Sequence, residues 1–553
     1  MIADSRSRTA TVLLGFFLGY GAIIANLLRI QVKNAHYFSK LGSQQYREKV
    51  VQSPPRAPLI DRTGKNYLAM NKDCISAFIT PHKLISPETV YPFLKEQFPE
   101  GYERLLTHAQ KKFLYIARRL TPEEIKSIEQ NAIPDIQLIC ETSRFYPYPS
   151  AGPLIGLTDI DNQGIMGAEH AFNSTLAGTP TTYILERDAR SGRFYFKRET
   201  TISGTSSTPV QLSIDADLQY LMMGELQKTF NQFQAQGAAA VIMDPDTGEI
   251  LAMASLPEFD PNNLRTLHIE ATKNSPLSDA YELGSVMKVF AALAALEEGV
   301  VGIDEPIDCK NAKTATFNGR TINTVHAHGI LPFSDVIAHS NNIGIAIVAS
   351  RLGDDLYTHY TRLGFGKKTG IELHGEHAGY VNPPEKWSKQ SLISLSYGYE
   401  VSATLLQLAS AFSIIANGGY QVTPTIMYDK NKQELLKQNI TQKSSTKLYK
   451  ESTITAIKDI LEKTVISGTM RAAQIKGYRL MCKTGTANML ENGIYNPEKN
   501  LYTCAGIIEK GPYRRVIVVS IREAVGKNLY AATVAAPLLG HIAQKLVIHE
   551  RII

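Results

Sequence analysis

The chain has 553 residues, of which 44% are hydrophobic and 20% are charged. These fractions are typical of globular proteins, and they exclude a disordered chain, a collagen-like fibre and a polytopic membrane protein. The net charge of +6 is small for this length, and no Lys/Arg cluster with interleaved aromatic residues is visible, so we expect no nucleic-acid partner. Five cysteines in 553 residues are too few for a disulfide-dense scaffold. None forms a CxxC pair, so we expect no metal site; they are Cys74, Cys140, Cys309, Cys482 and Cys504.

An apolar segment lies close to the N-terminus. From Thr11 to Leu28 no residue is charged, and Asn26 is the only strongly polar one. This length is near the lower limit for crossing a bilayer. The residues around Ala25 lack the small-residue pattern at which a signal peptide is cleaved. We therefore expect an uncleaved transmembrane signal anchor over residues 11–31, after a cytoplasmic tail of residues 1–10.

The orientation of this anchor does not follow from its flanking charges. Basic residues lie on both sides of the segment, so the count of positive charges is uninformative, and orientation has to be inferred from function. Gly15 and Gly19 have the spacing of a face against which another membrane helix packs.

Residues 32–212 contain no pattern of nucleophile and base. The stretch from Asp61 to Gly64 predicts a turn between two short strands. Residues 87–130 are rich in Lys, Glu and Gln and are expected to be helical and exposed. We interpret the whole region as a mixed, elongated pedestal that carries no chemistry of its own.

The remaining residues, 213–553, are predicted to form an α+β domain. A short strand and a helix are expected over 212–228, followed by a hairpin of two strands at 238–243 and 249–255. Long helical stretches follow. Further strands are expected at 478–523, with a final helix near 531–547. Strands at both ends with helices between them indicate an antiparallel sheet that is completed from both ends of the domain.

The first candidate for catalysis is Ser285, followed by Lys288 and an apolar helical stretch that ends near Gly299. This pattern predicts that Ser285 lies at a helix N-terminus, with free backbone N–H groups beside it. Lys288 is three residues further on and therefore lies on the same face. A serine hydroxyl is a weak nucleophile that needs a base, and a lysine can act as one if burial or neighbouring cations keep it neutral.

Two further motifs carry suitable side chains. Ser340 and Asn342 are two residues apart in a predicted loop between helices, so both can face one cleft. Lys483, Thr484, Gly485 and Thr486 follow a predicted strand, in which Lys483 and Gly485 share a face. Gly485 leaves room for a substrate backbone to approach.

Similar patterns occur at two other places, and we reject both. Ser444 and Lys447 have the spacing of Ser285 and Lys288, but they lie in a polar run with no apolar helix behind it. The sequence Lys368-Thr369-Gly370 repeats that at 483–485, but the preceding glycines indicate a turn.

In this order, the three motifs resemble the SxxK, SxN and KTG motifs of the penicillin-binding protein and serine β-lactamase superfamily. The stretch from Arg56 to Ala69 is similar to the RGxIxDRxGxxLA box of the class B penicillin-binding proteins, with Ala57 in place of a glycine. The segments 144–147 and 164–169 resemble further boxes of that pedestal, and Thr404-x-x-Gln407 resembles a signature of the catalytic domain. Length and the single anchor are most similar to the division-specific transpeptidases of that class.

The resemblance implies a peptidoglycan D,D-transpeptidase. In such an enzyme Ser285 attacks the penultimate D-alanine of a stem peptide, Lys288 takes its proton, and Ser340 passes a proton toward the departing D-alanine. The backbone N–H groups of Ser285 and Thr486 hold the oxyanion. The remaining implied contacts are with the terminal carboxylate (Lys483, Thr484 and Thr486) and with the substrate amide (Asn342). No cofactor is implied.

Partners and location also come from the resemblance. It implies stem peptides with D-Ala-D-Ala ends as substrate, β-lactams as covalent inhibitors, and both a membrane-embedded glycan polymerase and divisome proteins as partners. The catalytic domain is then periplasmic, on a single-pass anchor in the cytoplasmic (inner) membrane.

Several alternatives stay open at this stage. An elongation-type transpeptidase shares all of these motifs, and an inactive scaffold of the synthesis complex is a second possibility. A β-lactamase needs a water-activating group that we cannot assign. A β-lactam sensor usually has further membrane segments.

Overall fold

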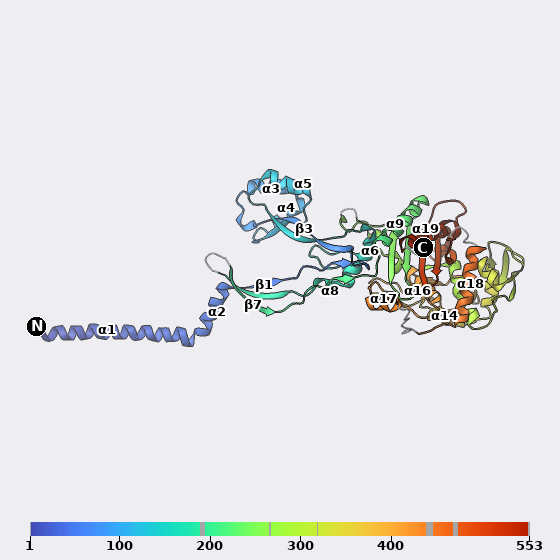
Figure 1. The fold of residues 1–553 in the computed structure, drawn as a ribbon. Helices are drawn as coiled ribbons and strands as arrows, with labels where there is room; N and C mark the ends of the chain where they lie inside the picture. The colour runs from blue at the N-terminus through green and yellow to red at the C-terminus, as the bar shows by residue number, and fades with distance from the viewer. Residues whose placement is uncertain are drawn as a thin grey trace. The chain divides into compact units, whose positions relative to one another are not determined.

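The computed structural model describes residues 2–187, 194–264, 267–317, 319–437, 446–467 and 474–550. They belong to two compact units, Met1–Arg56 with Ala177–Thr208, and Ala57–Leu176 with Pro209–Ile553 (Figure 1). In the first unit, helix α1 (Ile2–Leu28) continues into a π-helical segment (Arg29–Lys33). The 28 residues from Arg6 to Lys33 are apolar enough to cross a membrane, and none of the apolar window is buried. An apolar N-terminal helix is therefore present where the anchor is expected.

The rest of the first unit is a helix and a small sheet. Helix α2 (Ala35–Tyr46) leads into β1 (Arg47–Gln52), which pairs with β6 (Thr181–Arg187). Strand β7 (Phe194–Ile202) pairs with the other edge of β6, and both pairings are antiparallel. The segments before and after the intervening part of the second unit thus meet in one sheet.

The second unit begins with a sheet of short and long strands. Their order is β4-β3-β2-β8, with β5 paired to β3. The turn predicted at 61–64 joins β2 and β3, as expected. The strands and the helices that accompany them are β2 (Leu59–Ile60), β3 (Tyr67–Ile79), β4 (Leu114–Ala117), β5 (Gln137–Phe145), β8 (Val210–Gln211), α3 (Pro87–Gln97), α4 (Pro99–Thr107) and α5 (Pro122–Asn131).

The prediction that residues 87–130 are helical and exposed is wrong at β4. Leu114 and Ile116 are buried and alternate with more exposed neighbours, as expected for a strand with one face on a core. Their partners are Ala77 to Ile79 of β3, so the pairing depends on residues far away in the sequence. Local composition could not reveal it.

Two of the pedestal boxes meet in a buried ion pair. The guanidinium of Arg144 at the end of β5 donates from Nε to Glu169 (2.6 Å), which lies in α7 (Gly167–Ala171), and both side chains are almost fully buried. The same guanidinium donates to the carbonyl of Ala57 (2.8 Å) and to Asn71 (3.0 Å). One side chain therefore connects the three boxes noted in the sequence.

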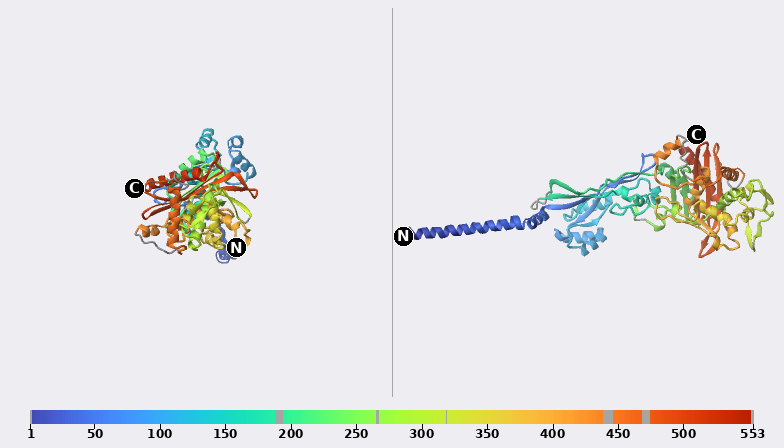
Figure 2. Two further views of the ribbon diagram at one scale, coloured as in Figure 1. Left: turned by 90° about the vertical axis from the view of Figure 1, so that its right-hand side faces the viewer. Right: turned by 90° about the horizontal axis from the view of Figure 1, so that it is seen from below.

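A second sheet of this unit has five antiparallel strands in the order β10-β9-β20-β19-β18. The predicted hairpin pairs β9 with β10, and β20 pairs with β9, so strands from both ends of the domain complete one sheet. These strands lie side by side, green beside red, in Figures 1 and 2. Their bounds are β9 (Gly237–Met243), β10 (Ile250–Leu256), β18 (Arg479–Glu491), β19 (Ile494–Lys510) and β20 (Tyr513–Arg522).

Helices cover both faces of this sheet. Helices α9 (Ala216–Gln232) and α19 (Ala531–His549) pack together with one face. The other face holds α11 (Lys288–Glu297), α16 (Leu405–Ala416) and α18 (Glu451–Ile466). Helix α16 is entirely buried, and the Thr404-x-x-Gln407 signature is its capping box, in which each side chain bonds the other residue's backbone N–H.

Short elements complete the second unit. They are α6 (Gly152–Ile155), α8 (Asn173–Ala177), α10 (Ser275–Ser278), β11 (Tyr281–Glu282), β12 (Pro306–Asp308), β13 (Thr314–Phe317), β14 (Arg320–Asn323), β15 (Ile330–Pro332), α12 (Phe333–Ala338), α13 (Asn342–Ala349), α14 (Asp355–Arg362), β16 (Tyr380–Val381), α15 (Ser391–Ser396), β17 (Val401–Ala403) and α17 (Lys430–Lys437).

Candidate active site

Ser285 lies in a tight turn rather than in the helix that follows it. Residues Gly284–Met287 form a 3₁₀ turn, and α11 begins only at Lys288. Ser285 therefore lies one turn before the α-helix, and not at its N-terminus as predicted. Gly284 has φ of +57°, a conformation in which a side chain is disfavoured, and this allows the chain to turn sharply into the serine. Ser285 itself is half-buried.

Lys288 is buried completely, beneath this turn. Its Nζ donates to the backbone carbonyl of Ser340 (2.6 Å) and to the Ser340 hydroxyl (3.1 Å). Burial lowers the pKa of Lys288 well below its ordinary value, and the nearby charge of Lys483 lowers it further. A lowered pKa favours the neutral amine, which is the form in which a lysine can act as a base.

Ser340 occupies the loop between α12 and α13 and is held in an unusual conformation. Its φ is +57°, and its backbone N–H donates to Ile337 (3.0 Å) at the end of α12. Its hydroxyl oxygen accepts from Lys288 and also from Lys483, each at 3.1 Å. The hydroxyl thus joins two lysines that are 195 positions apart in the chain, 483 minus 288.

Lys483 extends from β18 and is also fully buried. Besides Ser340, its Nζ donates to the carbonyl of Thr484 (2.9 Å). Burial lowers the pKa of Lys483 to about 8. In the described parts of the chain neither buried lysine has a carboxylate within ion-pair distance.

Strand β18 lies directly against the turn that carries Ser285, because two glycines allow close approach. A Cβ on Gly485 would lie 2.2 Å from the carbonyl oxygen of Leu283, and one on Gly284 would lie 2.7 Å from that of Thr486. β18 is the edge strand of the sheet. The N–H and C=O of one strand residue point the same way. The N–H of Thr486 therefore also faces the turn, as a donor to an oxyanion beside Ser285 must.

The other predicted site residues are Asn342, Thr484 and Thr486. Asn342 is the first residue of α13; its Nδ2 donates to Asn323 (2.6 Å), while its buried Oδ1 has no partner among the described residues. Thr484 and Thr486 alternate with Lys483, so their side chains leave the strand on its other side. The Thr486 hydroxyl accepts from the N–H of Ala531 (3.0 Å), which leaves its own hydrogen free to donate.

The structure thus brings Lys288, Ser340 and Lys483 into direct contact and sets Ser285, Gly485 and the backbone of Thr486 beside them. Sequence reasoning missed Gly398, whose Cβ would lie 2.1 Å from the carbonyl oxygen of Gly284. The glycine lies within the sequence Ser396-Tyr397-Gly398-Tyr399. Asn341, the residue between Ser340 and Asn342, was also missed; it is fully buried and caps α13.

The rejected motif at residues 368–370 lies elsewhere. Lys368-Thr369-Gly370 belongs to a loop, in which the backbone N–H groups of Thr369 and Gly370 donate to Glu376 (2.6 and 3.4 Å). Ser444 lies outside the described residues. Among the described residues, no group of three or more His, Cys, Asp or Glu side chains is arranged to hold a metal ion.

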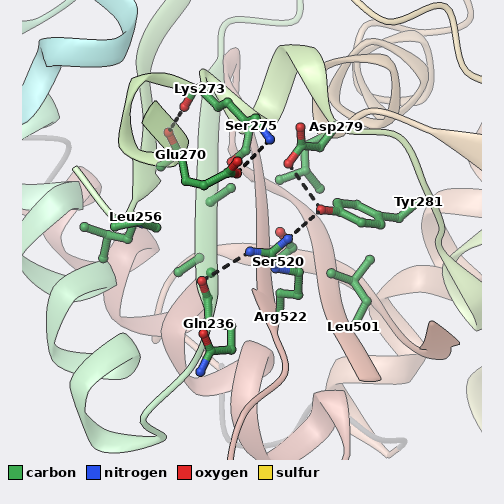
Figure 3. Close-up of a pocket in the computed structure, with 16 residues that line it drawn as sticks. Gln236, Leu256, Glu270, Lys273, Ser275, Asp279, Tyr281, Leu501, Ser520 and Arg522 are labelled. Atoms are coloured by element: carbon green, nitrogen blue, oxygen red, sulfur yellow. Dashed lines mark hydrogen bonds and ion pairs between the residues drawn. The ribbon is translucent and has the colours of Figure 1, made fainter. Parts of the chain in front are cut away.

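A separate cavity of about 230 Å³ lies next to the segment that leads to Ser285 (Figure 3). Arg522 donates there to the Tyr281 hydroxyl and to the carbonyl of Gln236, both at 3.3 Å, and Tyr281 donates to Asp279 (3.2 Å). Of the described residues that line it, none is a predicted site residue. The cavity is therefore distinct from the serine–lysine centre.

Two family models match the chain. Residues 238–544 match the penicillin-binding protein transpeptidase domain, and residues 51–212 match the penicillin-binding protein dimerisation domain. The chain is 32% identical to peptidoglycan D,D-transpeptidase FtsI of Escherichia coli K12 over 444 residues, which is 79% of this chain and 73% of that protein. It is 28% identical to stage V sporulation protein D of Bacillus subtilis, over 97% of this chain and 85% of that protein.

Solved structures give the same fold. Penicillin-binding protein 3 of Mycobacterium tuberculosis, in complex with ampicillin, superimposes with a TM-score of 0.66 at 25% identity. The superposition covers 91% of this chain and 96% of that one.

Proposed function

This chain belongs to the class B penicillin-binding proteins and is a serine-type peptidoglycan D,D-transpeptidase; on that premise, we propose that it cross-links stem peptides during septal wall synthesis, through an acyl-enzyme on Ser285. The observation that carries the residue assignment is the Ser340 hydroxyl shared by two buried lysines, together with the close packing of strand β18 against the turn that holds Ser285.

We propose that acylation proceeds as follows. Neutral Lys288 takes the proton of the Ser285 hydroxyl, and the oxygen attacks the carbonyl carbon of the penultimate D-alanine. The N–H groups of Ser285 and Thr486 stabilise the oxyanion, for which loss of one donor typically costs about 10²–10³ in rate. The peptide C–N bond then breaks. The proton held by Lys288 reaches the departing D-alanine amine through Ser340.

Deacylation reverses these roles. The amine of a neighbouring stem peptide attacks the acyl carbon, passes a proton back through the same groups to the Ser285 oxygen, and forms the cross-link. The Thr484 and Thr486 hydroxyls bind the terminal carboxylate of the donor peptide, and the charge of protonated Lys483, which leaves the strand on its other side, attracts that carboxylate. Asn342 binds a substrate amide through its unpartnered Oδ1. β-Lactams acylate Ser285 by the same route, and the ampicillin complex of a similar protein supports this expectation.

Labelling with a fluorescent penicillin tests the assignment. Ser285→Ala is expected to abolish covalent labelling of the full chain, and Lys483→Ala to reduce it strongly. The matched control is Lys368→Ala, which alters the rejected motif and should label as the wild type does. Labelling that persists in Ser285→Ala would show that another residue is the nucleophile.

We further propose the domain limits and topology expected from the sequence: a cytoplasmic tail (1–10), an anchor (11–31), a pedestal (32–212) and a periplasmic transpeptidase domain (213–553). The exposed apolar surface of α1 supports a single-pass anchor. The half-buried α19 also has suitable length and hydropathy, but it packs on the sheet as a core helix. Protease accessibility in spheroplasts tests this, because only the tail should be protected.

The septal role rests on similarity to relatives named FtsI. A fluorescently tagged copy in growing cells should form a band at midcell. A signal spread along the side wall would instead indicate an elongation-type enzyme.

We also propose that α1 binds a membrane partner, namely the glycan polymerase of a division complex. Gly15 and Gly19 line a shallow hollow on the helix together with Val12 and Phe16. Such small residues let two helices approach closely. Replacing both glycines by leucine should abolish co-purification of a membrane polymerase while leaving penicillin labelling intact. The matched control is Leu13→Ala with Leu14→Ala.

A further inference from the structure

The amide of Asn341 is fixed in orientation by the helix that it caps. Its side chain is fully buried, and its Oδ1 accepts the backbone N–H of Gly344 (2.9 Å) in the first turn of α13. Because the oxygen is used there, the amide nitrogen Nδ2 points the other way. It lies 3.3 Å from Nδ1 of His328.

This contact defines the state of His328. An amide nitrogen can only donate, so Nδ1 of His328 has to accept. An imidazole nitrogen accepts only when it carries no hydrogen, so His328 is neutral with its proton on Nε2. Protonation of Nδ1 would set two donors against each other and leave the buried amide of Asn341 without this acceptor.

The groups around His328 favour the neutral state. Its ring stacks on His339 at the end of α12 (5.1 Å between centroids) and lies 6.4 Å from His326. Burial lowers the pKa of His328, and the two histidines lower it further. On the adjoining segment, Asp308 and Lys310 pair with each other (3.1 Å), and the N–H of Asn311 donates to the His328 carbonyl (2.8 Å).

We propose that His328 is a positioning residue for acylation: as a neutral acceptor it holds Asn341, and thereby the neighbouring Ser340, in the conformation that both lysines bind. When His328 gains a proton, Asn341 is released and acylation of Ser285 slows. The link to the reaction is short, because Ser340 precedes Asn341 directly and keeps a strained backbone conformation. This inference rests on the proposed function.

The test compares the pH dependence of two replacements of His328. In His328→Asn, the side-chain oxygen can take the place of Nδ1 as an acceptor, but it does not titrate. His328→Leu removes the acceptor. The second-order rate constant of labelling by a fluorescent penicillin is measured on the detergent-solubilised full chain from about pH 5 to about pH 8. His326→Asn is the matched control, because that histidine does not contact Asn341.

We expect His328→Asn to label at close to the wild-type rate at neutral pH. As the pH falls toward 5, the protonated fraction of His328 in the wild type rises, so His328→Asn should label increasingly faster than the wild type, by up to about tenfold. His328→Leu should label about tenfold more slowly than the wild type at neutral pH. His326→Asn should keep an acid loss, shifted toward higher pH, because His326 lowers the pKa of His328. Protonation of Lys288 slows all four proteins equally and therefore cancels in these ratios.

Either of two results would overturn the role of His328. The first is that the labelling rates of the wild type and His328→Asn depend on pH in the same way. The second is that, at neutral pH, His328→Asn labels as slowly as His328→Leu. If His328→Leu does not fold, the comparison of the wild type with His328→Asn still tests the role of His328. Failure of the proposed function looks different, because the wild type would then not be labelled on Ser285 at any pH.

Discussion

Two buried clusters of charged side chains in the second unit use burial in opposite ways. In the pedestal part, the guanidinium of Arg144 is paired with Glu169 at 2.6 Å, and its other nitrogens donate to Ala57 and Asn71. In the catalytic part, Lys288 and Lys483 are buried just as completely, but their partners among the described residues are the Ser340 hydroxyl, which they share, and one backbone carbonyl each.

The difference indicates which buried ionisable groups can take part in a reaction. A guanidinium stays charged in proteins, so its burial requires a carboxylate, and the result is a fixed structural contact. A lysine can instead lose its proton when no carboxylate compensates for burial. Among the described residues no carboxylate lies beside Lys288, which supports the proposal that this lysine is the base, and the two clusters predict different responses to substitution.

The largest effect is expected from Lys288→Arg. The substitution keeps a cation but replaces a group that can be neutral by one that cannot. If Lys288 is the base, the acylation rate constant should fall by about 10²–10⁴. The measurement is the rate of labelling by a fluorescent penicillin, with Lys368→Arg as the control. Acylation within a few-fold of the wild type would exclude Lys288 as the base.

In the pedestal, Arg144→Gln should act on stability and not on chemistry. Removing one partner of a buried pair leaves an uncompensated carboxylate, which typically costs about 3–5 kcal/mol in the free energy of unfolding. Urea unfolding measures this, and the folded fraction should still be acylated. Arg118→Gln is the matched control. Its guanidinium pairs with Glu141 and Asp161 near the surface, so a loss of only about 1 kcal/mol is expected.

A third effect follows from close packing around the nucleophile. In Gly485→Ala the new Cβ meets the carbonyl of Leu283, so the strand or the turn has to shift. Misplacement of reacting groups by about 1 Å can cost about 10²-fold in rate. Acylation should therefore fall although the chain remains folded. Gly224→Ala in α9, where nothing lies within 4 Å, should leave the rate unchanged.

Much of this arrangement could be predicted from the sequence. The spacing of Ser285 and Lys288 ahead of an apolar helix, and the alternation at Lys483 and Gly485, are local patterns that the backbone geometry preserves. The completion of the sheet from both ends also followed from the order of strands and helices. In each case the period of a helix or a strand carries the information.

What the sequence did not reveal depends on contacts between distant segments. The start of α11 at Lys288 depends on the packing of Gly284 against Thr486, and β4 depends on its pairing with β3. The contact between His328 and Asn341 joins a loop to a helix cap without any periodic pattern. Which way the Thr486 N–H faces became evident only once β18 was known to be the edge strand.

The smallest effect is expected from raising the pH, which removes the charge of a buried lysine but not that of an arginine. Burial lowers the pKa of Lys483 to about 8, so this amine is protonated below that pH and loses its charge above it. Binding of a carboxylate requires the charged form. The second-order constant for acylation by a penicillin, which reports the free enzyme, should therefore fall by about tenfold per pH unit well above pH 8. Lys483→Arg keeps its charge there, so its profile should stay flat over the same range even if its rate is lower. A wild-type constant that stays level up to about pH 10 would mean that the charge of Lys483 does not bind the carboxylate.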